Sequence, residues 1–442
     1  MIKQFAKLLT LASVLVLSGC SYYDLEDIQP IDSVPAGLAI TDLQSAEAAR
    51  AGVYNSLQGN NFDRFLAGVQ YFSDECDWTG TFPTRAEFDI YNVVTGNNTL
   101  AGMFTSHYNT INVANNVIEI LPTVESPTID EDSRNSILAE ARFARALSYF
   151  ELVQNWQEVP LVLTPTRGVG DELNVARNTV DQVYSQVIED FTFAANNLVD
   201  LKSIGATVAA ANAMLARIAL YQERWDDARS LANAAVGDDY DLTAIPYLQD
   251  QIFFIEFSAT DGNSLAFFYG PSDLNGRYSI APSDALVDAY EDGDLRFEQS
   301  IAFADNGDPY GIKYDDFAVS AGAQTDPIRY VRGAEMVLIM AEANARMGDF
   351  DTASDMINMV RSRAGLDDVS LDDDNFVDAI LQERFVELAM ESGHRLWDLR
   401  RTGRALDVLG PGGYDPCDDV WPLPQRDIDR NPNLMQNDCC NC

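Results

Sequence analysis

Basic residues are scarce in this sequence. Its 442 residues include 29 Lys and Arg against 69 Asp and Glu, which gives a formal net charge of −40. A nucleic-acid-binding protein needs a basic surface for the phosphates, so this balance excludes that class. It also disfavours attraction to anionic lipid. Highly anionic polysaccharides are disfavoured as ligands too, unless a local basic pocket or calcium offsets the acidic surface.

Histidine and the common hydrolase motifs are almost missing. His107 and His394 are the two histidines, and neither His-Glu-x-x-His nor Gly-x-Ser-x-Gly occurs. A glycosidase needs only two carboxylates at a set separation, which a sequence does not reveal. We predict that the protein is not an enzyme. A surface glycosidase or peptidase is the alternative, which an assay for hydrolysis of glycans or peptides would detect.

Long apolar runs are absent apart from one at the N-terminus. Lys3 and Lys7 precede an apolar stretch over 8–17, which is shorter than the roughly 20 residues of a membrane-spanning helix. A charged start, a short apolar core and small residues before Cys20 are typical of a secretory signal. The Leu-Ser-Gly-Cys pattern resembles the bacterial lipobox, whose cysteine is lipidated and so anchors the protein to a membrane. We predict a signal peptide over 1–19 and lipidation of Cys20; the alternative is an ordinary signal peptide with a chance cysteine.

Few cysteines remain if Cys20 carries the lipid: Cys76, Cys417, Cys439, Cys440 and Cys442. An exported protein can form disulfides, so Cys417 could pair with one of the three terminal cysteines. A zinc cluster would need two spaced cysteine pairs or nearby histidines, and the sequence offers neither. We expect no cofactor and no metal site, with calcium the one cation left open.

Apolar residues three and four positions apart predict a mainly helical chain. The predicted helices cover 43–58, 101–121, 133–155, 179–200, 207–222, 225–236, 331–347, 350–364, 374–391 and 394–409. The helix pairs 207–222 with 225–236 and 331–347 with 350–364 resemble each other. In each pair an aromatic residue follows a tight turn and precedes an alanine by three residues, and a second alanine, Ala216 or Ala341, lies twelve residues before that alanine. This pattern favours tetratricopeptide-like helical hairpins. Two unrelated hairpins are the alternative.

The helical periodicity is lost in several stretches. Residues 20–42 contain acids and prolines and are typical of a tether between an anchor and a folded body. Residues 72–98 and 244–330 are irregular, and the second stretch is rich in Gly, Pro, Asp and aromatic residues. We predict one folded body over 43–442, in which helical repeats (43–243), a loop-rich ligand-binding insert (244–330) and C-terminal helices with a tail (331–442) follow one another.

Five separated motifs of the chain point to one known family. They are the lipobox ending at Cys20; Ala139-Glu140-Ala141-Arg142-Phe143-Ala144-Arg145-Ala146 with Val159-Pro160-Leu161-Val162; Ile328-Arg329-Tyr330 with 337–343 and 360–366; Glu383-Arg384-x-x-Glu387-Leu388 with Gly393-His394-Arg395-Leu396-Trp397-Asp398-Leu399-Arg400-Arg401; and Pro422-Leu423-Pro424 with Ile428 and Asn431-Pro432-Asn433-Leu434. Together they resemble the SusD/RagB family of outer-membrane nutrient-binding lipoproteins, and they span nearly the whole chain in the family's order. Phe385, where an Arg is frequent, and an extra residue at Ser392 are small departures.

The resemblance implies both a fold and a role. The implied fold is tetratricopeptide-like helical hairpins that support an irregular, loop-rich ligand-binding half. The implied role is a lipid-anchored lid, on the cell surface, over a SusC-like TonB-dependent barrel transporter in the outer membrane. Such a lid captures an oligomeric nutrient, an oligosaccharide or a peptide, and delivers it to the barrel. A tetratricopeptide-like scaffold lipoprotein for outer-membrane assembly is the alternative.

Many charged residues lie in these motifs and could be mistaken for an acid–base site. The set comprises Arg142, Arg145, Glu342, Arg361, Arg363, Glu383, Arg384, Glu387, Arg395, Asp398 and Arg400. Arg and Glu at three- and four-residue spacings on helices more often join neighbouring helices by ion pairs. We therefore predict a structural network, with Glu391 and Arg395 as one pair if the helix continues through Gly393.

Better candidates for a binding site lie in the irregular stretches, where aromatic and polar residues alternate. A sugar ring needs a flat apolar face to stack on and polar groups for its hydroxyls. The first candidate set is Asp74, Asp77, Trp78, Thr79 and Phe82, and the second is Tyr269, Asn275, Arg277, Tyr278, Tyr310 and Tyr314. Trp78 could equally pack inward. The family has no fixed ligand motif, so none of these residues is carried over from it.

Overall fold

Helices make up most of the structure, which is a computed structural model describing residues 39–59, 62–168, 170, 173–199 and 205–438. The longer helices are α2 (Leu43–Gln58), α5 (Asn98–Ile120), α6 (Glu131–Trp156), α7 (Val180–Asn197), α8 (Val208–Tyr221), α9 (Trp225–Val236), α13 (Gly333–Arg346), α14 (Phe350–Arg363), α15 (Phe376–Glu387) and α16 (His394–Arg401). The shorter ones are α3 (Gly68–Gln70), α4 (Pro83–Asp89), α10 (Leu265–Tyr269), α11 (Asp284–Ala289), α12 (Phe297–Ser300), α17 (Ala405–Leu409) and α18 (Gln425–Ile428). The prediction of a mainly helical fold is confirmed. No described helix is both long enough and apolar enough to cross a membrane.

Side-chain caps fix where the main helices begin. Asp42 and Ser45 form a reciprocal capping box on α2, and Thr179 with Gln182 forms another on α7. Asp130 caps α6 by accepting a hydrogen bond from the Ser133 amide. These caps satisfy amides that have no partner within the helix, so the predicted starts of these helices agree with the structure to within a few residues.

Two predicted helices end earlier than the periodicity indicates. The helix predicted over 394–409 is two helices, α16 and α17, because Gly403 lies between them with a left-handed φ of +69°. The helix predicted to reach 391 ends at Glu387, and Met390 and Ser392 follow with φ of 60° and 66°. The prediction that Glu391 pairs with Arg395 along one continuous helix is therefore wrong.

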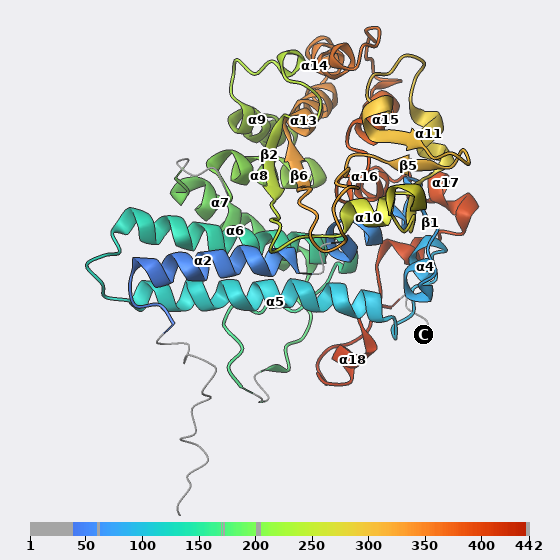
Figure 1. Ribbon diagram of the computed structural model, residues 1–442. Coiled ribbons are helices and arrows are strands. Elements are labelled where there is room, and N and C mark those ends of the chain that lie inside the picture. The colour runs from blue at the N-terminus through green and yellow to red at the C-terminus, as the bar shows by residue number, and fades with distance from the viewer. Residues whose placement is uncertain (1–38, 60–61, 169, 171–172, 200–204, 439–442) are drawn as a thin grey trace, which may run out of the picture.

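The long helices pack in sequential pairs, and the chain climbs from α2 and α5 at the base of Figure 1 to α14 at its top. The hairpins α8–α9 and α13–α14 are far apart in sequence, yet α9 packs against α13. Ala216 and Ala341 are both fully buried, as expected of small residues that let paired helices approach closely. The likeness of these hairpins to tetratricopeptide repeats stays a prediction.

Strands are short and occur as three two-stranded sheets. They are β1 (Cys76–Trp78) with β3 (Ile280–Pro282), β2 (Gln251–Ile255) with β6 (Ile328–Arg332), and β4 (Ile301–Phe303) with β5 (Pro309–Gly311), all antiparallel. Because β2 and β6 pair, the segment between them leaves the helical body and returns to it at the same place. This segment, 256–327, contains α10 to α12, and its helices α10 and α11 lie on the right-hand side of Figure 1, next to α15 and α16.

The C-terminal tail holds the irregular 72–98 stretch against the helices. Trp421 is 1% exposed, and its ring lies 5.1 Å from that of Phe88 and 5.2 Å from that of Trp156, centroid to centroid. Its amide donates to the Asn155 carbonyl, and the Trp156 indole donates to the Pro422 carbonyl. The tail is therefore part of the core that positions the loops before α5.

We expect Trp421→Ala to lower the free energy of unfolding by about 3–5 kcal/mol, because a large cavity replaces the ring between the tail and α6. Urea denaturation of the purified variant measures this loss. Met435→Ala is the control, since the Met435 side chain is 72% exposed. A loss below about 1 kcal/mol for Trp421→Ala would show that the tail does not support the core.

Candidate functional site

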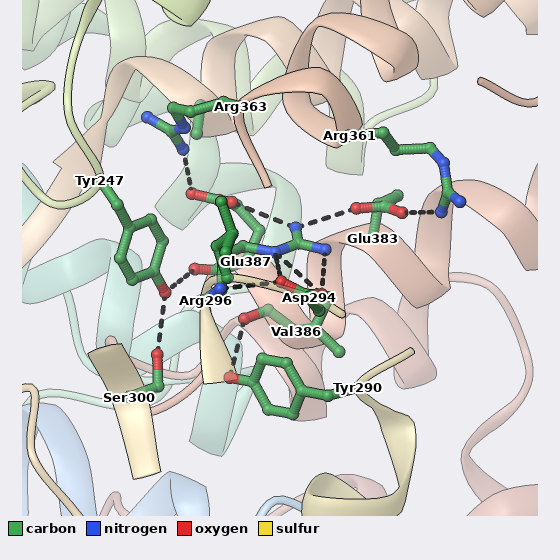
Figure 2. Close-up of polar contacts among 12 residues, drawn as sticks. Tyr247, Tyr290, Asp294, Arg296, Ser300, Arg361, Arg363, Glu383, Val386 and Glu387 are labelled. Atoms are coloured by element: carbon green, nitrogen blue, oxygen red, sulfur yellow. Dashed lines mark hydrogen bonds and ion pairs between the residues drawn. The ribbon is translucent and has the colours of Figure 1, made fainter. Parts of the chain in front are cut away.

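The charged residues of the family-like motifs form buried ion pairs inside the protein (Figure 2). Arg296 Nη1 lies 2.9 Å from Glu383 Oε2 and 3.2 Å from Glu387 Oε2. Arg361 reaches Glu383 at 2.5 Å, and Arg363 reaches Glu387 at 2.5 Å. Burial alone would raise the pKa of Glu387, but the neighbouring guanidiniums hold it well below its ordinary value. Carboxylates that are buried, ionised and fully paired serve the fold and have no access to a substrate.

Most of the other motif arginines and acids follow the same rule, whereas Arg142 pairs with the exposed Glu189 and Arg400 donates to main-chain carbonyls. The further buried pairs are Arg145–Asp190, Arg332–Asp250, Arg332–Glu391, Lys313–Glu391, Arg384–Asp398 and Arg401–Glu342. Arg395 pairs with Asp74 at 2.6 Å, which ties α16 to the loop before β1. The prediction of a structural network is thus confirmed, with the partners of Glu391 and Arg395 corrected.

The two predicted binding segments, far apart in sequence, meet at the β1–β3 ladder. Asp77 pairs with Ala281 and Trp78 with Ile280. One residue further, the Thr79 amide donates to the Ser279 carbonyl at 3.1 Å, and the Thr79 hydroxyl donates to the Tyr278 carbonyl at 2.5 Å. The loop after β1 and the insert therefore form one continuous surface.

An exposed aromatic ring flanked by two guanidiniums lies on this surface. Phe82 is 42% exposed, and the guanidinium carbons of Arg277 and Arg85 lie 4.4 and 5.4 Å from its centroid. Arg85 also lies 5.2 Å from the ring of Phe268, and the partly exposed Tyr278 follows Arg277 in the chain. We call Phe82, Arg85, Phe268, Arg277 and Tyr278 the Phe82 patch.

The backbone that carries Arg277 is held firmly. The amides of Arg277, Tyr278 and Ser279 donate to the carbonyls of Phe267, Gly270 and Phe268, at 2.6, 2.8 and 2.8 Å. A Cβ on Gly276 would lie 1.9 Å from the Gly270 carbonyl oxygen, so only glycine allows this close return of the chain. Arg277 is thus presented from a fixed turn.

Three predicted site residues lie inside the protein. Trp78 is 8% exposed and packs against Tyr71, with no room above it because Gly80 covers the ring. Trp78 therefore packs inward and does not face a ligand. Tyr269 and Tyr314 are at most 1% exposed, their rings lie 5.4 Å apart, and the Tyr314 hydroxyl donates to the Met390 carbonyl. Their rings are core packing, because apolar area this large is removed from water wherever the fold allows it.

The remaining predicted residues lie nearer the surface. Asp77 and Thr79 are exposed, and Asn275 occupies a left-handed turn position with φ of 63°. Tyr310 is partly exposed and packs edge-on against Phe317, whereas Asp74 is engaged by Arg395. Cys20 lies outside the described residues.

Arg85 and Phe268 belong to the Phe82 patch but were not predicted from the sequence. Arg85 follows Phe82 by three residues at the start of α4, so its spacing could have indicated a shared helical face. Phe268 could not be separated from the neighbouring buried Tyr269 by pattern alone, because α10 is only one turn long.

Cysteine and metal chemistry offer no second site within the described part of the chain. Cys76 is a buried free thiol, and Cys417 is disulfide-bonded. No cluster of three or more His, Cys, Asp or Glu side chains suited to a metal ion occurs among those residues. A role for calcium stays a prediction.

One buried acid close to β1 has a strongly shifted pKa. Glu75 precedes β1, is 2% exposed, and accepts a hydrogen bond from the Met390 amide. Burial raises the pKa of Glu75 to about 8, against the lowering effects of that amide and of Lys313. The side chain is therefore protonated at neutral pH in the folded protein.

Comparisons with known proteins agree with this architecture. The family described as the SusD family matches residues 310–416, and the one described as starch-binding associating with outer membrane matches residues 38–220. Two SusD-like proteins of Formosa agariphila are 24% and 26% identical to the chain, over 98% and 97% of it and the same shares of each relative.

Solved structures share the fold. A SusD superfamily protein from Bacteroides vulgatus superposes with a TM-score of 0.78 at 23% identity, over 90% of this chain and 99% of that one. A laminarin-binding SusD-like protein gives 0.78 at 23% identity, over 90% and 100%. A surface glycan-binding protein from Bacteroides fluxus gives 0.75 at 20% identity, over 90% and 100%.

We expect wild-type protein to lose stability as the pH rises from about 5 to 8, through the contribution of Glu75. Its folded pKa of about 8 lies above the value of an unfolded glutamate, so the folded state binds the extra proton and rising pH removes that advantage. Glu75→Gln keeps the neutral acceptor and should flatten this part of the profile. Thermal midpoints measured from pH 5 to 9 test this; parallel profiles for both proteins would contradict it.

Proposed function

Because the chain belongs to the SusD/RagB family, we propose that it captures an oligomeric glycan at the surface of the bacterial outer membrane and does not cleave it. The observation that carries the proposal is the β1–β3 junction, which brings the loop after β1 and the insert together around Phe82. The family match described as starch-binding, and relatives named for laminarin and surface-glycan binding, support a glycan as the ligand.

The Phe82 patch has the chemistry that sugar capture requires. Phe82 and Phe268 supply apolar ring surface, and Arg277 supplies a guanidinium. Outside the patch itself, the exposed Thr79 and Asn275 lie on the two segments that meet there and offer a hydroxyl and an amide for sugar hydroxyls. The aromatic rings limit the conformational entropy lost on binding, because each has only two rotatable bonds. Binding of this kind needs no acid–base group, in agreement with the paired state of the buried carboxylates.

The proposed partner is a SusC-like TonB-dependent barrel, over which the protein acts as a lid. Lipidation of Cys20 would hold the body at the membrane through the 20–42 tether, without a spanning helix. The captured oligosaccharide would then pass to the barrel, and the transporter would supply the energy. A peptide is the other ligand class that such a lid could deliver.

We expect Phe82→Ala to weaken glycan binding about tenfold or more, because the ring provides the apolar face of the patch. Affinity electrophoresis against soluble polysaccharides, laminarin among them, identifies a bound glycan, and calorimetry measures the change. Met347→Ala is the matched control, since Met347 is 40% exposed and lies at the end of α13. Equal affinity for Phe82→Ala and wild type would remove the patch from the binding site.

We expect a TonB-dependent barrel to co-purify in stoichiometric amount with tagged protein from native membranes in mild detergent. The Cys20→Ser variant, which cannot be lipidated, should move to the soluble fraction and recover much less barrel. Mass spectrometry of the recovered proteins measures both. Recovery of assembly factors without a barrel would favour the scaffold alternative, and retention of Cys20→Ser in washed membranes would contradict the lipid anchor.

A further inference from the structure

We propose that the Phe82 patch selects oligosaccharides that carry negative charge, as sulfate esters or carboxylates, and that Arg277 is the residue that recognises this charge. The inference rests on the proposed glycan-binding function and names the class of glycan. It runs against the charge of the chain as a whole, which carries 69 acidic and 29 basic residues. The local surroundings of Phe82 therefore have to supply the argument.

Arg277 differs from most arginines of the protein in its charge pairing. With more than two acids for each base, most described arginines are bound to carboxylates, and Arg134 and Arg329 instead donate to main-chain carbonyls. Arg277 is exposed and forms no ion pair within the described residues; its single polar contact is a long one, 3.4 Å from Nη2 to the Thr81 hydroxyl. An arginine left without a carboxylate on so acidic a protein is available to an anion from outside.

The orientation of the Arg277 side chain is restricted by its neighbours. The guanidinium carbon of Arg277 lies over the Phe82 ring, 4.4 Å from its centroid. The main chain at Arg277 is fixed by the hydrogen bonds that the amides of residues 277–279 donate. The ring contact and the hydrogen bond to Thr81 restrict the guanidinium, and its remaining N–H donors stay available to a ligand. A planar, pre-oriented fork of this kind binds carboxylate and sulfate oxygens in pairs and loses little entropy in doing so.

Two guanidiniums lie close to the exposed ring of Phe82. The guanidinium carbons of Arg277 and Arg85 are 4.4 and 5.4 Å from the ring centroid, so a sugar that stacks on the exposed part of this ring lies near both groups. A sulfate or carboxylate on that sugar would gain charge-assisted hydrogen bonds that a neutral sugar cannot form.

The acids near Tyr278 give the patch a direction. Burial and the carboxylates of Asp308 and Asp77 together raise the pKa of the Tyr278 hydroxyl to about 12. Two carboxylates therefore lie near Tyr278, whereas two guanidiniums lie near Phe82. A charged sugar should place its anionic group at the Phe82 end, with neutral residues of the chain continuing toward Tyr278.

The test compares paired probes that differ only in charge, titrated into the full-length mature protein. One pair is a sulfated galactan oligosaccharide and its desulfated form; the second is an oligogalacturonate and its methyl ester; laminarin is the neutral reference. We expect wild type to prefer the charged member of at least one pair by about tenfold or more, and to lose this preference in high salt. The pair that shows the preference separates sulfate from carboxylate recognition.

Arg277→Gln should abolish the preference, because it lowers the affinity for the charged member of a pair more than the affinity for the uncharged member. Arg277→Lys should recover only part of it, because an ammonium lacks the fork. Arg229→Gln is the matched charge control, since Arg229 forms an exposed pair with Asp226 on α9, and thermal midpoints verify folding. If wild type binds the neutral member of each pair as tightly as the charged member or more tightly, this inference is wrong and glycan capture stands. The same holds if Arg277→Gln keeps the preference of wild type. Binding to none of the probes overturns both.

Discussion

The carboxylate of Glu387 is the point at which three separate parts of the chain are joined. It receives Arg296 from the insert, Arg332 from β6 and Arg363 from α14, all inside the protein. Burying an ion costs several kcal/mol, and that cost is offset only when partners are supplied in good geometry. The insert, the strand that ends it and the last helical hairpin must therefore all be in place before Glu387 is stable in its charged form.

This constraint reaches the candidate binding surface through short connections. Lys313, in the insert, donates to the Glu387 carbonyl and pairs with Glu391 in the turn after α15. The same turn presents the Met390 amide to Glu75, and Arg395 just beyond it holds Asp74. The loop that carries Phe82 is thus attached to the buried ionic network by neighbours at its base, which explains how an irregular segment can be presented in one orientation.

The sequence determined the helical part of this structure well and the site only in part. Helices recur with apolar residues at regular spacing, so their positions could be predicted; the breaks at Gly403 and Ser392 could not, because they depend on single left-handed residues. The charged motifs were recognised as structural from their helical spacing. The pairing of β1 with β3 could not be foreseen, since a three-residue strand shows no alternation. The burial of Tyr269 and Tyr314 could not be foreseen either, because it involves contacts with Gln70 and Met390, which are distant in the sequence.

Because β2 pairs with β6, the insert is a β-hairpin in which the connection between the strands, residues 256–327, forms a small lobe. Material between two adjacent strands can lengthen, shorten or be replaced without moving the helices on either side. Selection can then act on what the lobe recognises while the body that carries it stays the same. The freedom is limited at two positions, because any replacement lobe must still return Arg296 and Lys313 to the acids of α15 and the turn that follows it.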